Sequence, residues 1–274
     1  MTIDSHVHFW NYDAVRDSWI TDEMKILRQN YLPGQLVAHL KENNIDGCVA
    51  VQADQQEAET LFLCQLSKEH DFIKAVVGWI DLQQDDIDKR LQYFSQFPVI
   101  KGWRHIVQAE PDGFLEKENF LRGIQALSNY NYTYDLLLYH TQLKQALEFV
   151  HQFPQQKFVI DHCAKPDIKN IEINNWKIYM KEMAAMPNVY CKISGLITET
   201  NWNKWAATDF YSYLDTVFDL FGTNHLMFGS DWPVMLLSGN YRQWKNLVEK
   251  YMQDFSATDK EKIFGLNAIQ FYNL

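Results

Sequence analysis

The sequence is organised around eight short apolar runs that recur along its whole length, separated by segments long enough to form helices. The runs are Thr2–Trp10, Asp46–Ala53, Ile73–Leu82, Pro98–Val107, Thr133–Tyr139, Lys157–Ala164, Val189–Gly195 and His225–Pro233. Several are almost continuously apolar, which is typical of parallel strands that are buried on both faces. The connections are mostly too long for hairpins, so helices are expected between the strands.

The segments between these runs carry apolar residues at helical spacing. In Thr141–Phe153, for example, Leu143, Ala146, Leu147 and Val150 follow the i, i+3, i+4, i+7 pattern. The expected helices are Pro33–Asn44, Glu57–His70, Thr141–Phe153, Asp209–Phe221, Tyr241–Phe255 and Ala257–Phe271. This alternation predicts an α/β protein, a single-domain (β/α)8 TIM barrel over residues 1–274. A doubly wound open sheet fits less well, because it has fewer strands and a glycine-rich first turn that this chain lacks.

Composition excludes several classes of protein. The 25 Lys+Arg against 35 Asp+Glu give a net charge of −10, which argues against a nucleic-acid partner. No apolar run reaches the roughly 18 residues of a membrane span, so no membrane partner is expected. The four cysteines form no CxxC pair, and the first residues have neither the basic nor the apolar segment of a signal peptide. We therefore expect a cytoplasmic protein. A homo-oligomer is compatible with the sequence.

The first strand ends in the motif Asp4-Ser5-His6-Val7-His8. Residues two apart on a strand point to the same face, so His6 and His8 are expected to project together into the mouth of the barrel. Two imidazoles at one strand end can bind a metal ion or donate hydrogen bonds to a developing oxyanion. Barrel enzymes build their active sites at this end of their strands.

Two further strand ends carry ionisable residues that face the same mouth. Asp231 lies in Gly229-Ser230-Asp231-Trp232-Pro233 at the end of strand eight. His162 follows the apolar end of strand six, in Asp161-His162-Cys163-Ala164-Lys165-Pro166. Because neighbouring strand residues face opposite ways, Asp161 is expected to point away from His162.

These motifs, in this order, resemble the amidohydrolase superfamily, and within it the amidohydrolase-2 branch of lactonases. DSHVHFW, KGWRH, DHCAKP, CKISGL and FGSDWP all match that branch. The resemblance implies hydrolysis of a sugar-acid lactone, such as L-fucono- or L-rhamnono-lactone. It also implies that His6, His8, His162 and Asp231 either hold one divalent ion, with zinc preferred, or act without a metal. Lys101 is expected too deep to bridge two ions and the place of His140 is open, so a binuclear site is not expected.

The chemistry of ester hydrolysis suggests the role of each residue. Asp231 is expected to take a proton from water and return it to the ring oxygen, while His6, His8 and His162 assist at the carbonyl. The substrate is expected to be bound by residues at the mouth of the barrel: Arg104, His105, Lys192, Tyr139, Trp10 and Trp232. Tryptophan faces suit the C–H surfaces of sugar rings.

Three other functions remain open on the sequence. A zinc-dependent decarboxylase of an aromatic or unsaturated acid would use the same histidines and aspartate. A barrel that only binds a partner would be expected to lack at least one of these four residues, and all are present. A serine hydrolase is less favoured, since no GxSxG motif occurs.

Overall fold

Eight parallel strands form one sheet in the order β1 to β8, and the computed structural model describes all residues from 1 to 274. The strands are β1 (Ile3–Val7), β2 (Gly47–Val51), β3 (Ile73–Gly78), β4 (Ile100–Ile106), β5 (Thr133–Leu137), β6 (Phe158–Ile160), β7 (Val189–Ile193) and β8 (Leu226–Phe228). Each lies within its predicted run, so the prediction of eight parallel strands is confirmed.

Contacts just beyond the regular pairing bring β8 back to β1. Val7 forms a parallel bridge with Trp232, and the His8 amide donates to the Trp232 carbonyl at 2.8 Å. The Asp231 amide donates to the His6 carbonyl at 2.9 Å, and the Ser5 hydroxyl donates to the Phe228 carbonyl at 2.7 Å. These bonds complete the TIM barrel, and they fix His6, His8 and Asp231 beside one another through the backbone.

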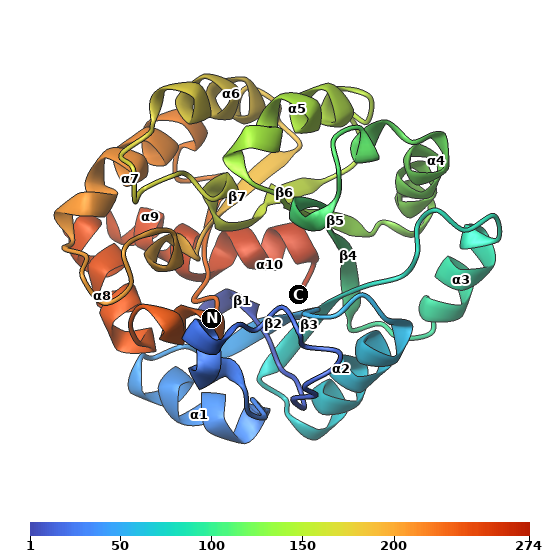
Figure 1. Cartoon of the computed structure of the whole chain (residues 1–274), viewed down its shortest axis with the longest axis horizontal. Coiled ribbons are helices and arrows are strands. Elements are labelled where there is room, and N and C mark those ends of the chain that lie inside the picture. The colour runs from blue at the N-terminus through green and yellow to red at the C-terminus, as the bar shows by residue number, and fades with distance from the viewer.

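Helices surround the strands as an outer ring (Figure 1). They are α1 (Pro33–Glu42), α2 (Glu57–Glu69), α3 (Ile87–Phe94), α4 (Glu118–Leu127), α5 (Leu143–His151), α6 (Asn174–Ala184), α7 (Thr208–Phe221), α8 (Tyr241–Tyr251), α9 (Ala257–Glu261) and α10 (Asn267–Tyr272). The expectation of a helix over Ala257–Phe271 is confirmed, with one irregularity: a π-helical turn at Lys262–Leu266 lies between α9 and α10. At this turn Gly265 meets the N-terminus, where a Cβ would lie 2.2 Å from the Met1 carbonyl oxygen.

The barrel interior is apolar at its N-terminal end. Side chains from the strands and from α10 pack there in one cluster, made of Ile3, Val49, Val51, Ala75, Val77, Val159, Met227, Ala268, Phe271 and Tyr272. Figure 1 shows α10 crossing the centre of the ring of strands. Because α10 and this cluster fill the N-terminal end, the polar residues of the interior are left to the C-terminal end.

The long connection after β1 forms an ordered lobe at the C-terminal end of the barrel. The backbones of Trp10 and Tyr31 pair as an antiparallel bridge, with both N–H···O distances at 2.9 Å, and so close the base of the loop. The Trp10 indole N–H also donates to the Gln29 carbonyl at 2.9 Å. The lobe carries Trp19, which is 45% exposed.

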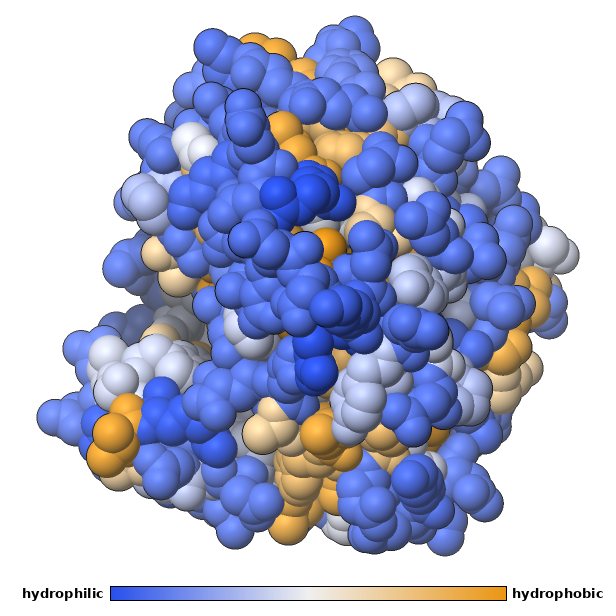
Figure 2. Space-filling view, turned by 90° about the vertical axis from the view of Figure 1, so that its right-hand side faces the viewer, coloured by the Kyte–Doolittle hydropathy of each residue, from blue (hydrophilic) through white to orange (hydrophobic).

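The surface is mostly polar. On the face shown in Figure 2, hydrophilic residues dominate and apolar ones form small separate groups. No helix combines the length and the apolar character that crossing a membrane requires. Cys48, Cys64, Cys163 and Cys191 are all buried and free of disulfide bonds.

Candidate active site

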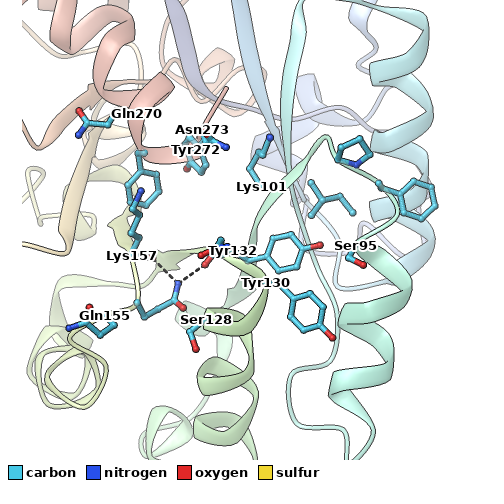
Figure 3. Close-up of a pocket in the computed structure, with 16 residues that line it drawn as sticks. Ser95, Lys101, Ser128, Tyr130, Tyr132, Gln155, Lys157, Gln270, Tyr272 and Asn273 are labelled. Carbon is cyan, nitrogen blue, oxygen red and sulfur yellow. Dashed lines mark hydrogen bonds between the residues drawn. The ribbon is translucent and has the colours of Figure 1, made fainter.

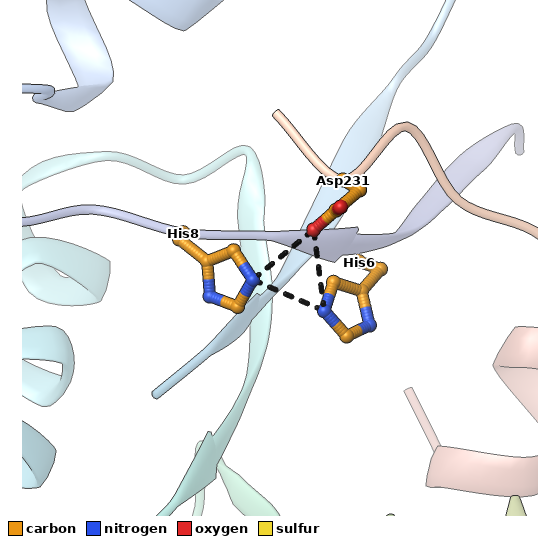
Figure 4. A group of neighbouring side chains, drawn as sticks. All are labelled: His6, His8 and Asp231. Carbon is orange, nitrogen blue, oxygen red and sulfur yellow. Dashed lines mark hydrogen bonds and ion pairs between the residues drawn. The ribbon is translucent and has the colours of Figure 1, made fainter. Parts of the chain in front are cut away.

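His6 and His8 converge at the end of β1, as their spacing predicts. Both side chains are buried, and their Nε2 atoms lie 3.1 Å apart (Figure 4). The Nδ1 atom of His8 lies 2.8 Å from the Val51 carbonyl oxygen. Because a carbonyl only accepts hydrogen bonds, Nδ1 of His8 carries the proton. Its Nε2 therefore presents a lone pair to the site whenever the ring is neutral.

Two consecutive residues after β6, Asp161 and His162, both face the site, because a left-handed segment begins at His162. β6 ends at Ile160, and residues 162–165 have φ between 48° and 58°. Asp161 Oδ1 lies 3.3 Å from His6 Nδ1, and His162 Nε2 lies 3.8 Å from Asp231 Oδ1. The expectation that Asp161 points away from His162 is therefore wrong: Asp161 faces the barrel interior like Val159 two residues before it, and the positive φ of His162 turns the next side chain to the same side.

Residues after β7 make room for His162 and orient its ring. A Cβ on Gly195 would lie 2.6 Å from Cγ of His162, so no other residue leaves space for the imidazole there. Next to it, the Ser194 hydroxyl is 2.8 Å from His162 Nδ1. This contact directs the other ring nitrogen, Nε2, toward Asp231.

Asp231 lies at the centre of the three histidines. It follows β8 with φ at 61°, and its side chain is almost fully buried. Its Oδ1 is 3.3 Å from His8 Nε2 and 3.8 Å from His6 Nε2 (Figure 4). Burial opposes ionisation of this carboxyl, but His162, His8 and His6 outweigh it and hold the pKa of Asp231 below its ordinary value. The group is therefore an ionised base at neutral pH.

Beneath these residues lies a buried network of two carboxylates and two cations. Lys192 Nζ is 2.5 Å from Asp135 Oδ2 and 3.0 Å from Asp161 Oδ1, and Arg104 Nη1 is 3.0 Å from Asp161 Oδ2. All four side chains are at most 3% exposed. Burial raises the pKa of Asp135 to about 6 despite Lys192. Burial acts on Asp161 too, but Lys192, His6 and Arg104 outweigh it, so its pKa lies well below the ordinary value.

This network touches His6 in a way that supports either of its neutral tautomers. His6 Nδ1 lies 3.1 Å from Lys192 Nζ, a donor, and 3.3 Å from Asp161 Oδ1, an acceptor. With the proton on Nδ1, His6 faces Asp161 with a donor, and its Nε2 presents a lone pair that lies 3.3 Å from Arg104 Nη1. With the proton on Nε2, His6 accepts from Lys192 and donates to the bare Nε2 of His8. The site can therefore be satisfied with or without a metal ion.

A cavity of about 280 Å³ opens above these groups at the mouth of the barrel. Its polar lining includes His8, His162, Asp231 and Arg104. Its apolar lining comes from several loops and strand ends: Trp10, Trp19, Ala53, Ile106, Leu137 and Val234. The apolar residues are suited to C–H surfaces, while the polar residues present a base and hydrogen-bond donors.

The sequence does not predict two of the polar residues that line this cavity. Lys165 and Gln108 both line it, and Lys165 forms no ion pair, although its ammonium lies 5.3 Å from the centre of the Tyr139 ring. The DHCAKP motif contains Lys165, but only the left-handed backbone shows that it faces the cavity. Gln108 follows β4 in a short 3-10 turn and has no motif of its own.

Four of the six residues expected to bind substrate do not line the cavity. Lys192 lies below it, fully buried among carboxylates. Trp232 is 1% exposed and packs between Phe9 and Tyr31, because the chain turns outward after Asp231. Their expected place at the mouth is wrong, whereas Trp10 and Arg104 do line the cavity.

His105 and Tyr139 also lie elsewhere. His105 stacks on Phe114 in the helix layer and contacts Glu110 at 2.8 Å, because it faces the side of β4 opposite to Arg104. Tyr139 is 41% exposed outside the cavity lining. Lys101 lies at the start of β4, at the other end of the barrel, and His140 contacts the Lys165 carbonyl through Nδ1 at 2.8 Å. Neither is among the groups near Asp231.

The chain matches one protein family over almost its whole length. Residues 3–274 match the sequence model of the amidohydrolase family. The chain belongs to this family. An L-fucono-1,5-lactonase of Burkholderia multivorans (strain ATCC 17616 / 249) is 35% identical to this amidohydrolase over 286 residues, covering 100% of this chain and 96% of the relative.

Solved structures of amidohydrolases share the fold. One from Burkholderia multivorans with bound zinc superposes with a TM-score of 0.97 at 35% identity, covering 100% of this chain and 99% of the other. A dihydroxybenzoic acid decarboxylase from Polaromonas sp. JS666 has a TM-score of 0.71 at 14% identity, with 100% and 97% covered. At that identity the likeness to the decarboxylase shows the fold alone.

The donor atoms fit a zinc ion. Zinc–ligand bonds of about 2.0–2.1 Å in a tetrahedron place ligand atoms about 3.3 Å apart. The Nε2 atoms of His6 and His8 and Oδ1 of Asp231 are separated by 3.1, 3.3 and 3.8 Å. In addition, the Val51 carbonyl accepts from Nδ1 of His8, and Asp161 Oδ1 lies 3.3 Å from Nδ1 of His6, so each imidazole has an outer partner of the kind that metal-binding histidines use.

The buried network generates a prediction about stability. Lys192→Met should lower the free energy of unfolding by about 3–5 kcal/mol, because it leaves Asp135 and Asp161 in the interior with one cation between them. Adding Asp135→Asn should recover part of this loss. Urea denaturation at neutral pH measures the free energy of unfolding of the two single variants and of the double variant. A single variant as stable as wild type, or a double variant that loses the sum of the two single effects, would contradict the pairing.

Proposed function

We propose that this amidohydrolase hydrolyses a sugar-acid lactone, with L-fucono-1,5-lactone as the representative substrate. The observation that carries the proposal is the ionised Asp231, placed among three histidines in a cavity lined by both apolar and polar residues. The full-length similarity to a protein named L-fucono-1,5-lactonase supports the same substrate class.

The cavity can position a lactone through both its apolar and its polar lining residues. Trp10 and Trp19 offer flat apolar surface to the ring and to a methyl group. On the polar side, Arg104 and Lys165 provide donors for hydroxyl and carbonyl oxygens, and Gln108 provides an amide. Because Asp161 and Gln52 already fix the Arg104 guanidinium, its orientation is set before the substrate binds.

Hydrolysis then requires one proton to move twice. Asp231 accepts a proton from water as the water oxygen bonds to the lactone carbonyl carbon. The carbonyl oxygen becomes an oxyanion, which the Arg104 guanidinium stabilises. When the bond between the carbonyl carbon and the ring oxygen breaks, Asp231 returns the proton to that oxygen. The product is the open hydroxy acid. A zinc ion held by His6, His8 and Asp231 would supply a Lewis acid that polarises the carbonyl.

A lactone panel assayed with a pH indicator tests this function. The protein should release acid from 1,5- and 1,4-lactones of 6-deoxy sugar acids such as L-fuconic and L-rhamnonic acid. Asp231→Asn keeps the shape of the side chain but removes the base, so kcat should fall by about 10²- to 10⁴-fold. Asp54→Asn is the matched control, because it removes one charge after β2 at the same end of the barrel but outside the cavity lining.

The outcomes separate the proposal from its main alternative. Near wild-type turnover in Asp231→Asn would refute the role of this carboxylate. No acid release across the panel, together with CO₂ release from dihydroxybenzoic or other aromatic acids, would replace the lactonase with a decarboxylase.

A further prediction concerns the metal. Protein stripped with a chelator should bind close to one equivalent of zinc, measured by competition with a coloured chelator. His8→Gln should weaken this affinity by at least about 10- to 100-fold, since loss of an outer-shell partner alone costs that much. His70→Gln, which alters a histidine just after α2, should leave it unchanged. Equal zinc affinity in the wild type, His8→Gln and His70→Gln would show that the zinc site does not include His8.

A further inference from the structure

A second large cavity lies at the end of the barrel opposite to Asp231. It has a volume of about 790 Å³ and is lined by 16 residues, which belong to the starts of β4 and β6, the segment before β5, and α10. Because all strands run parallel, these segments meet at the N-terminal face of the barrel. No residue of this basal cavity also lines the cavity above Asp231.

The lining of the basal cavity is positively charged. It contains Lys101 and Lys157, and none of its 16 residues is aspartate or glutamate, although the chain carries 35 acidic residues against 25 basic ones. Neither lysine is among the cations that form ion pairs in this structure. Two uncompensated ammonium groups in a concave surface attract an anion.

The same lining offers groups that recognise hydroxyls. In Figure 3, Lys157 and Lys101 lie on opposite sides of the opening, with Tyr272 and Asn273 above and Tyr132 below. The exposed Gln155, Gln270 and Asn273 each bring a side-chain amide, which can donate and accept hydrogen bonds. The Tyr272 hydroxyl is already engaged, since it donates to Asp135 at 2.8 Å, so this residue contributes its ring to the floor.

We propose that the basal cavity binds a small oxyanion that also carries hydroxyl groups, namely a sugar acid or a sugar phosphate. The two lysines attract the carboxylate or phosphate, and the amides bind the hydroxyls. An uncharged sugar lacks the first interaction and inorganic phosphate lacks the second, so both should bind more weakly. This site is separate from the lactone-binding cavity, and it does not depend on the reaction proposed there.

Isothermal titration calorimetry with three probes tests this site. D-gluconate and D-glucose 6-phosphate represent the two anion classes, and D-glucose is the uncharged control. At least one anion should show a binding component that the variant Lys101→Gln/Lys157→Gln weakens about tenfold or more. Lys144→Gln/Lys177→Gln removes the same charge from exposed positions on α5 and α6 and should retain that component. Any binding at the Asp231 site persists in both double variants.

A second measurement uses the wild-type protein alone. The anion that binds should protect Lys101 and Lys157, but not Lys144, from an amine-reactive reagent, with the modified lysines identified by mass spectrometry. The proposal is overturned if neither anion binds, if binding is equal in the two double variants, or if D-glucose binds as tightly as the anions. Lactone hydrolysis should be unchanged in Lys101→Gln/Lys157→Gln, so failure of this proposal is distinguishable from failure of the lactonase function.

Discussion

The buried pairing of Lys192 and Arg104 with Asp161 and Asp135 is the interaction on which the active site depends. A barrel interior can hold charged groups only when each is compensated, because an unpaired buried charge costs several kcal/mol. Here the compensated network lies between the apolar N-terminal half of the barrel and the catalytic residues. Asp161 and Lys192 both reach His6 Nδ1, so the network also controls which nitrogen of that imidazole faces Asp231. Stability and catalysis therefore share the same four side chains.

Asp231 is the group through which this buried network acts on the reaction. Its carboxylate is buried, which alone would favour the protonated form, yet the histidines around it lower its pKa. Burial in turn lowers the pKa of His162 to about 4, against the attraction of Asp231 and Asp161. The result is an ionised carboxylate beside the neutral imidazoles of His6 and His162 at neutral pH. This pairing suits a group that must accept a proton from water and release it one step later.

The sequence predicts the barrel and the principal histidines well, since both depend on local patterns. Apolar runs define strands, and the HxH spacing places His6 and His8 together. The errors arise where the backbone leaves the strand geometry. The left-handed segment after β6 turns His162 to the same side as Asp161 and brings Lys165 to the cavity, and the turn at Asp231 sends Trp232 away from it. The error for His105 has another cause. Arg104 and His105 are neighbours on β4, so only one of them can face the barrel interior, and the KGWRH motif alone does not say which.

The pH dependence of kcat/KM for L-fucono-1,5-lactone tests the central claim most directly, namely that the fold keeps Asp231 ionised and the imidazoles of His6 and His162 neutral. Since the pKa of Asp231 is lowered and that of His162 is about 4, kcat/KM should stay constant from neutral pH down to about pH 5. It should fall only as the pH approaches 4. A decline centred near pH 6.5, the ordinary value for histidine, would contradict the account.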